Sequence, residues 1–192
     1  ASLGVGQVAA LNPNSVAKLT GDQIAALSAS QVAALTTAQI KILGSTQVSA
    51  LSSDVFAALT SLQIPAFSTK ALSGLNADQI SDFSTKQISF LTPSQVSALT
   101  STQLSGLKVE DVAAMSVSLI QAISASGVSG LSTEFIAALP TDKIMVLSVG
   151  AVGGLTSDQI EAFSTAQVDA LTTRQIAALK STQTAALGTD DL

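Results

Sequence analysis

A large apolar residue recurs at every eighth position of this chain, without a single insertion or deletion. This series begins at Leu3 and ends at Leu187, and it contains only Leu, Phe, Met and Ile. A second apolar series begins at Val8, three positions earlier in the unit, and Thr184 is its only polar member. A fixed period of this kind predicts a repeat architecture. The 192 residues therefore form 24 units with the consensus S/T-x-x-Q-I/V-x-A-L, numbered below as positions 1 to 8.

The start of each unit carries the signals of a helix N-terminus. Position 1 is Ser or Thr in 16 units, and position 4 is Gln in 14 units. In such a capping box the hydroxyl accepts from the backbone N–H three residues on, and the Gln side chain reaches back to the cap N–H. Pro13 and Pro93 directly follow a cap, where a helix tolerates proline. Each unit is therefore predicted to be one short capped helix.

Acidic residues support the same interpretation. Eight units have Asp or Glu at position 3, where a negative charge suits a helix N-terminus: Asp22, Asp54, Asp78, Glu110, Glu134, Asp142, Asp158 and Asp190. A single continuous helix is disfavoured, because eight residues overshoot two full turns by about 80° and the Leu series would spiral around the axis. A β-solenoid is also disfavoured, because Q-I-x-A-L lacks clean alternation.

One unit is too small to bury a core of its own, so neighbouring units must share one. We expect an all-α fold: a solenoid, or helical coil, of 24 eight-residue units over residues 1–192. We expect this array to be a single domain and a fragment of a longer chain. Position 7 is mostly Ala or Gly, which suggests close backbone approach between successive helices at the edge of the core. The number of units per turn, the handedness and the oligomeric state stay open.

Composition narrows the functional classes. The chain contains no Cys and no His, so the usual neutral-pH base, thiolate nucleophiles and the commonest zinc ligands are missing. The net charge is −5 without a basic cluster, which argues against a nucleic-acid partner. The two uncharged stretches, Gln87 to Leu107 and Val112 to Thr133, contain recurring Ser, Thr and Gln, which argues against membrane insertion. We expect no enzyme activity, no cofactor, and no catalytic, cofactor-binding or metal site.

Several local features allow a second interpretation. The acidic pairs Glu110-Asp111 and Asp190-Asp191 are candidates for calcium or acid–base chemistry, although first-turn helix charge accounts for them. Ser and Thr also recur at position 2 and could form a regular row of surface hydroxyls that binds ice or carbohydrate. The Gln side-chain amides could stack between successive coils instead of closing capping boxes. Six consecutive units lack the Gln and carry other residues at position 4, namely Asp111, Leu119, Gly127, Phe135, Lys143 and Ala151.

We interpret the missing glutamines of those six units as neutral sequence drift in a spacer, since the Ile and Leu series keep their eight-residue spacing throughout. The alternative is an interaction patch formed by Leu119, Phe135, Met145 and Val146. On the drift interpretation, Phe135→Ser is expected to cost less stability than Ile136→Ser, because only Ile136 belongs to the apolar series.

The pattern resembles the octapeptide repeat arrays of large secreted or surface-attached bacterial adhesin-like proteins. The units Thr36 to Leu43, Ser84 to Leu91, Ser164 to Leu171 and Thr172 to Leu179 carry this resemblance most clearly, and it covers the whole chain. Such arrays are also labelled haem-utilisation-like, a role that nothing in a chain without His supports. Leu91 to Leu99 further resembles the opening of the DNA-reading repeats of transcription-activator-like effectors, which are about four times longer and basic, so we set that resemblance aside.

The resemblance implies a non-enzymatic structural or spacer segment, a stalk, located outside the cell or on the bacterial cell surface. Its partners would be other domains of the same long chain or a surface ligand. The alternative is a binding module that presents a repetitive Ser/Thr/Gln face to carbohydrate, ice or a protein partner.

Overall fold

A computed structural model describes residues 3–188, and every regular element in that range is helical. One element falls in each complete unit from Gly4–Leu11 to Lys180–Leu187, which confirms the predicted all-α solenoid. The α-helices are α1 Val5–Ala9, α2 Pro13–Val16, α3 Gly21–Ala25, α4 Ala29–Ala33, α5 Thr37–Ile42, α6 Ser45–Ser49, α7 Ser53–Ala58, α8 Thr69–Leu72, α9 Ala77–Ser81, α10 Thr85–Ile88, α11 Pro93–Ala98, α12 Ser101–Leu104, α13 Asp111–Ala114, α14 Val117–Gln121, α15 Thr133–Ala137, α16 Thr141–Val146, α17 Val149–Gly154, α18 Ser157–Glu161, α19 Thr165–Asp169, α20 Thr173–Ile176 and α21 Ser181–Thr184. The 3₁₀ helices are η1 Ile64–Ala66 and η2 Val128–Gly130.

The unit around α11 illustrates the local geometry. Thr92 is extended at φ −91° and ψ 155°, and its hydroxyl accepts from the Gln95 N–H at 3.2 Å. After one turn of helix the N–H of Leu99 donates to the Val96 carbonyl at 3.1 Å, and Leu99 is extended again. Two successive extended residues, Leu99 and Thr100, then redirect the chain into the next helix. No residue in the described range has a positive φ, so these turns need no glycine.

Two units depart from the predicted capped α-helix and contain a 3₁₀ helix instead. In η1, Pro65 has no N–H to donate four residues back, so the α-helical pattern cannot continue. The unit with η2 contains Gly127 and Gly130, and glycine lowers helix propensity. The prediction of one short α-helix per unit is therefore wrong for these two units.

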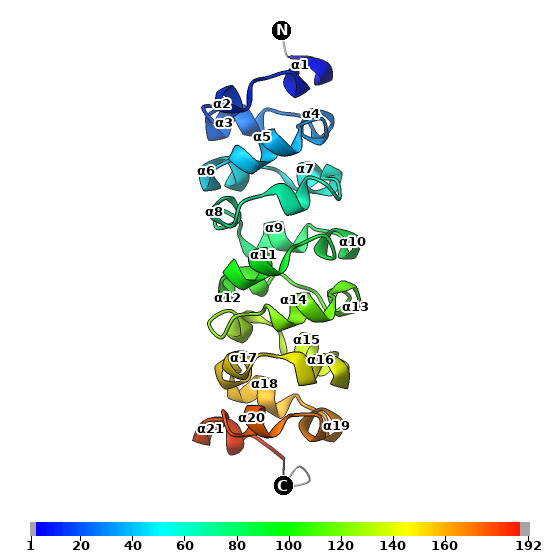
Figure 1. Ribbon diagram of the computed structural model, residues 1–192, viewed down its shortest axis with the longest axis vertical. Coiled ribbons are helices and arrows are strands. Elements are labelled where there is room, and N and C mark those ends of the chain that lie inside the picture. Colours follow the sequence, from blue (N-terminus) through cyan, green and yellow to red (C-terminus); the bar gives the residue numbers. More distant parts are fainter. Residues whose placement is uncertain (1–2, 189–192) are drawn as a thin grey trace.

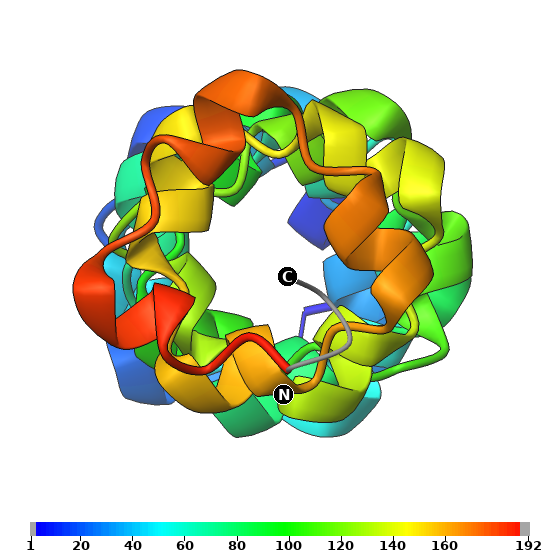
Figure 2. The same cartoon turned by 90° about the horizontal axis from the view of Figure 1, so that it is seen from below.

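The helices wind into a coil whose turns stack along one long axis (Figures 1 and 2). Helices in contact are three units apart along the chain, as in the pairs α2 with α5, α3 with α6 and α4 with α7. Side-chain hydrogen bonds between turns join residues that are 28 and 31 positions apart, which is more than three units and less than four. One turn of the coil therefore takes between three and four units, a number that the sequence left open.

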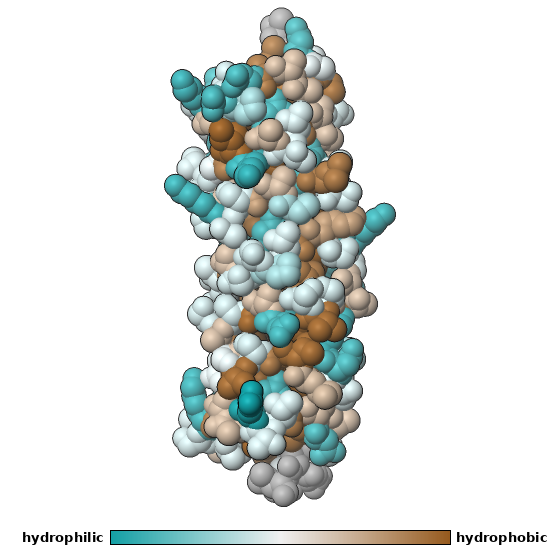
Figure 3. Space-filling view, in the orientation of Figure 1, coloured by the Kyte–Doolittle hydropathy of each residue, from teal (hydrophilic) through white to brown (hydrophobic). Residues whose placement is uncertain are grey.

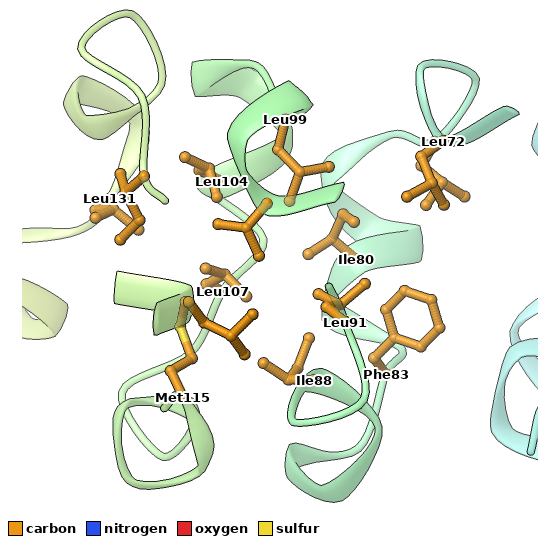
Figure 4. Packing of buried hydrophobic residues seen from close by; sticks show 14 of the residues in the cluster. Leu72, Ile80, Phe83, Ile88, Leu91, Leu99, Leu104, Leu107, Met115 and Leu131 are labelled. Carbon is orange, nitrogen blue, oxygen red and sulfur yellow. The ribbon is translucent and has the colours of Figure 1, made fainter. Parts of the chain in front are cut away.

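The two apolar series form the core. Position 5 is at most 7% exposed from Val8 to Val168, and 0% at Ile40 and Ile120. Position 8 is at most 8% exposed from Leu35 to Leu171, with Leu99 at 3%. Figure 4 shows these side chains converging from successive turns on the middle of the coil. They form one continuous cluster from Val8 to Leu171. Burial of each Ile or Leu contributes about 1.5–3 kcal/mol, so the shared core is the main stabilising term.

Glycines at position 7 lie where the backbone of another turn leaves no room for a Cβ. A Cβ added at Gly130 would lie 1.8 Å from the Ser101 carbonyl oxygen, and one at Gly106 would lie 2.2 Å from that of Ala77. Gly74 and Gly154 show the same relation to residues 29 positions earlier. The predicted close approach is confirmed, but the partner is the unit three earlier and not the adjacent one.

Candidate functional sites: the glutamine ladder and the outer surface

The position-4 glutamines connect each turn of the coil to the preceding one. The Nε2 of Gln103 donates to the carbonyls of Leu72 at 2.7 Å and Leu75 at 2.9 Å, which are 31 and 28 residues earlier. The same pair of bonds recurs at Gln39, Gln47, Gln63, Gln87, Gln95, Gln159, Gln167, Gln175 and Gln183. We call these ten side chains the glutamine ladder. Each bonds one carbonyl that also accepts a backbone N–H, such as that of Leu72 from Leu75, and a second, such as that of Leu75, for which the glutamine is the hydrogen-bond donor.

The other end of the same amide closes the capping box. The Oε1 of Gln95 accepts from the Thr92 N–H at 2.8 Å, while the Gln95 N–H donates to the Thr92 hydroxyl. Even where the cap is Gly44, its N–H donates to Gln47 Oε1 at 2.9 Å. Capping and stacking between turns, which the repeat pattern left as alternatives, are therefore performed together by Oε1 and Nε2 of one side chain.

The longest interruption of the ladder lies where six consecutive units lack the glutamine, and Val55 and Ala71 also replace it. Asp111 is 2% exposed; its Oδ2 accepts from the Lys108 N–H, as a ladder Oε1 would, but its Oδ1 has no hydrogen-bond partner within the described residues. Lys143 keeps part of the pattern, since its Nζ donates to the carbonyl of Val112, 31 residues earlier. Beside it, Val109, Ala113, Pro140 and neighbouring residues line a shallow cavity of about 310 Å³.

The interaction patch, the alternative to drift, cannot be formed by its four named residues. Leu119 is 2% exposed and Phe135 is fully buried, so both pack inside the coil at position 4. Met145 is exposed and Val146 is half-buried. The expectation that Phe135 matters less than Ile136 rested on Phe135 lying outside the core, and this premise is wrong, since both side chains are fully buried.

The acidic residues behave mainly as helix-terminal charges. Asp22, Asp54, Asp78, Glu134, Asp142 and Asp158 lie in the first turn of their helices, as predicted, whereas Glu110 directly precedes α13. The backbone N–H of Glu134, and then the Ser132 and Thr133 side chains, lower the pKa of the Glu134 carboxyl. A lowered pKa adds stability above the unfolded-state value that is lost as the pH falls through the folded-state value. Asp190 and Asp191 lie outside the described residues.

The face of the molecule in Figure 3 is mostly of intermediate hydropathy, with scattered hydrophobic and hydrophilic residues. Thr37, Ser53, Thr69, Thr165 and Thr173 at position 2 are exposed, so hydroxyls are available on the surface. The ladder glutamines are buried, and they do not contribute to that surface. Within residues 3–188 no group of three or more acidic side chains is placed to hold a metal ion, and no helix there is long and apolar enough to cross a membrane.

These features define an α-solenoid of octapeptide repeats, with capped single-turn helices, a shared apolar core and side-chain amides joining its turns. The ALTTAQ repeat family matches residues 1–37, 32–61, 136–173 and 160–189, and the chain belongs to this family. The stretch between these matches includes Asp111, Leu119 and Gly127, where the consensus Gln is replaced. No curated protein shows significant similarity to the chain.

Proposed function

We propose that the array is a non-enzymatic spacer: a stalk segment of a bacterial surface or secreted protein. The observation that carries this proposal is the glutamine ladder, because it repeats one junction between turns along the molecule. A rod built from one repeated junction has a length proportional to its number of units, so it can hold the parts at its two ends a fixed distance apart. The octapeptide pattern, which resembles arrays in secreted and surface-attached bacterial proteins, supports the location.

Antibodies raised against the array test the location. Intact source cells and their culture medium are compared with permeabilised cells, with a cytosolic protein as the control for leakage. We expect signal on intact cells or in the medium. Signal only after permeabilisation would contradict a surface or secreted stalk.

The alternative function, a binding module, is favoured by one observation: the exposed hydroxyls at position 2, such as Thr37 and Thr173. Carbohydrate, ice or a protein partner would then bind a surface formed by these hydroxyl groups. A glycan array, an ice-recrystallisation assay and a pull-down examine these ligands in turn. Saturable binding that is lost when Thr37, Thr69, Thr165 and Thr173 are replaced by Ala, with the fold intact, would favour the binding module over the spacer.

A further inference from the structure

The junction between α13 and the preceding turn of the coil brings oxygen atoms together without a donor. Elsewhere in the ladder, position 4 supplies an Nε2 that donates to the carbonyls 31 and 28 residues earlier. Counted back from Asp111, these offsets lead to Ile80 and Phe83, both labelled in Figure 4. A carboxylate has only acceptor oxygens. Asp111 therefore presents an acceptor at the place where the ladder presents a donor.

The register of the ladder continues through the segment that lacks the glutamine. The Nζ of Lys143 donates to the carbonyl of Val112, which is 31 residues earlier. A Cβ added at Gly127 would lie 3.0 Å from the carbonyl oxygen of Leu99, which is 28 residues earlier. The position-4 residues of this segment, Asp111 among them, therefore face the same two carbonyls of the preceding turn as a ladder glutamine does.

Two oxygen atoms at this junction have no hydrogen-bond donor among residues 3–188. One is Oδ1 of Asp111, a side chain that is only 2% exposed, whereas Oδ2 accepts from the Lys108 N–H at 2.9 Å. The other is the carbonyl oxygen of Phe83, while the Ile80 carbonyl accepts from the Phe83 N–H at 3.2 Å. A buried carboxylate without a partner is costly. A group with positive charge between these oxygens would remove that cost.

The length of the aspartate side chain sets the space at the junction. Asp has one methylene fewer than Gln, so its oxygen ends about 1.5 Å short of the place that a ladder Nε2 reaches. At Gln103 the Nε2 lies 2.7 and 2.9 Å from its two carbonyl oxygens. The oxygens across the Asp111 junction are then about 4 Å apart, which is too long for a hydrogen bond and within the range of two oxygen ligands that share one cation.

The charge of the site favours a monovalent cation. Asp111 is the only carboxylate at position 4 of any unit, and Glu110 beside it is exposed and directly precedes α13. One carboxylate balances one positive charge, whereas a divalent ion would leave a buried excess of charge. Backbone carbonyls bind alkali cations by replacing their hydration shell. The ligands available at this junction are therefore of the kind that sodium and potassium ions take.

We propose that Asp111 Oδ1 and the carbonyls of Phe83 and Ile80 bind one alkali cation, sodium or potassium, between two turns of the coil. The ion takes the place of a ladder Nε2 and joins α13 to the turn before it. Its binding stabilises the folded array, because the unfolded chain does not bring these oxygens together. The proposal concerns this junction alone and does not depend on the stalk role.

Thermal melts of the whole chain in sodium, potassium and choline chloride at equal ionic strength test the proposal. We expect a midpoint about 2–4 °C higher in sodium or potassium chloride than in choline chloride, and the salt with the larger shift identifies the ion. Asp111→Asn removes the charge that holds the ion, so the difference between salts should vanish. Asp158→Asn is the matched control: it removes the same charge at an exposed first-turn site and should keep the difference.

Two further measurements locate the ion. Asp111→Gln restores the ladder donor, so its midpoint should also be the same in all three salts. Crystals grown with rubidium, which replaces potassium and scatters anomalously, should show an anomalous peak beside Asp111 in the wild-type chain and none in Asp111→Asn. Circular dichroism confirms that each variant is folded.

Three results would overturn the proposal. Equal wild-type midpoints in all three salts would mean that a water molecule or a proton joins the two oxygens instead. A difference between salts that Asp111→Asn retains would place the ion elsewhere. Stabilisation by added calcium chloride, without any by sodium or potassium chloride, would indicate a divalent site.

Discussion

At the scale of single residues, the contribution of a position-4 glutamine to the free energy of unfolding depends on whether a preceding turn lies beside it. Gln95 is 2% exposed and bonds two carbonyls as well as its cap, whereas Gln23 bonds only its cap among residues 3–188. Gln95→Leu should therefore cost roughly 1–3 kcal/mol for each buried group left unpaired. Gln23→Leu should cost no more than about 1 kcal/mol, as for a lost cap. Urea unfolding of both variants measures the difference, and equal costs would show that the bonds between turns add nothing.

Asp111 offers the converse test, because it is a position where the ladder can be completed. Its Oδ1 is buried without a partner, while Oδ2 already accepts from the Lys108 N–H. Asp111→Gln replaces the unpaired oxygen with an amide that can donate to the preceding turn. We expect the free energy of unfolding to rise by about 1–3 kcal/mol. Asp158→Gln, at an exposed first-turn site, is the control, and a fall in stability at 111 would contradict the ladder geometry.

At the scale of the helical element, four position-7 glycines lie against the backbone of the preceding turn. A Cβ at Gly130 would meet the Ser101 carbonyl at 1.8 Å, whereas a Cβ at Gly6 in α1 meets nothing within 4 Å. Gly130→Ala should therefore destabilise by about 1–3 kcal/mol or more through overpacking. Gly6→Ala should be neutral or stabilise by up to about 1 kcal/mol, because alanine favours helix. Thermal melts distinguish the two, and similar melts would mean that the turns are farther apart than the structure places them.

The whole unit is the element that should be removable. Deleting Thr92–Leu99 joins Leu91 to Thr100 in phase, and Gln103 then faces the carbonyls of Ile64 and Phe67 that Gln95 bonds now. Deleting only Ser94–Ser97 leaves one helix unable to form and breaks the register. We expect a slight loss of stability for the first deletion and on the order of several kcal/mol, or a split transition, for the second. Comparable melts for both would rule out the octapeptide as the structural unit.

At the scale of the whole molecule, the period, the helices and the core series could be predicted because each depends on local signals. The offset between turns could not, since it follows from small backbone angles at residues such as Leu99 and Thr100 that accumulate along the coil. The burial of Phe135 and Leu119 was missed for the same reason, because position 4 faces a turn about 30 residues away. Spacing alone also could not show that one Gln amide uses both of its ends.

A coil of this kind should shorten without losing its structure. Removing whole units from the C-terminal end, for example everything after Leu155, leaves the remaining core and junctions in place. We expect the helical circular dichroism signal per residue to stay constant while small-angle scattering reports a shorter rod of unchanged cross-section. A β-type spectrum of the intact chain, or collapse of helix content on shortening, would contradict the solenoid.

The absence of positive φ angles in the described residues has an evolutionary consequence. Every described connection uses backbone conformations that any L-amino acid adopts, so none needs glycine for its φ angle. Unequal recombination between the coding sequences of two units, offset by any whole number of units, would then yield an array of different length in which every unit keeps the same local structure. Length in such an array becomes a trait that selection can adjust in steps of one unit.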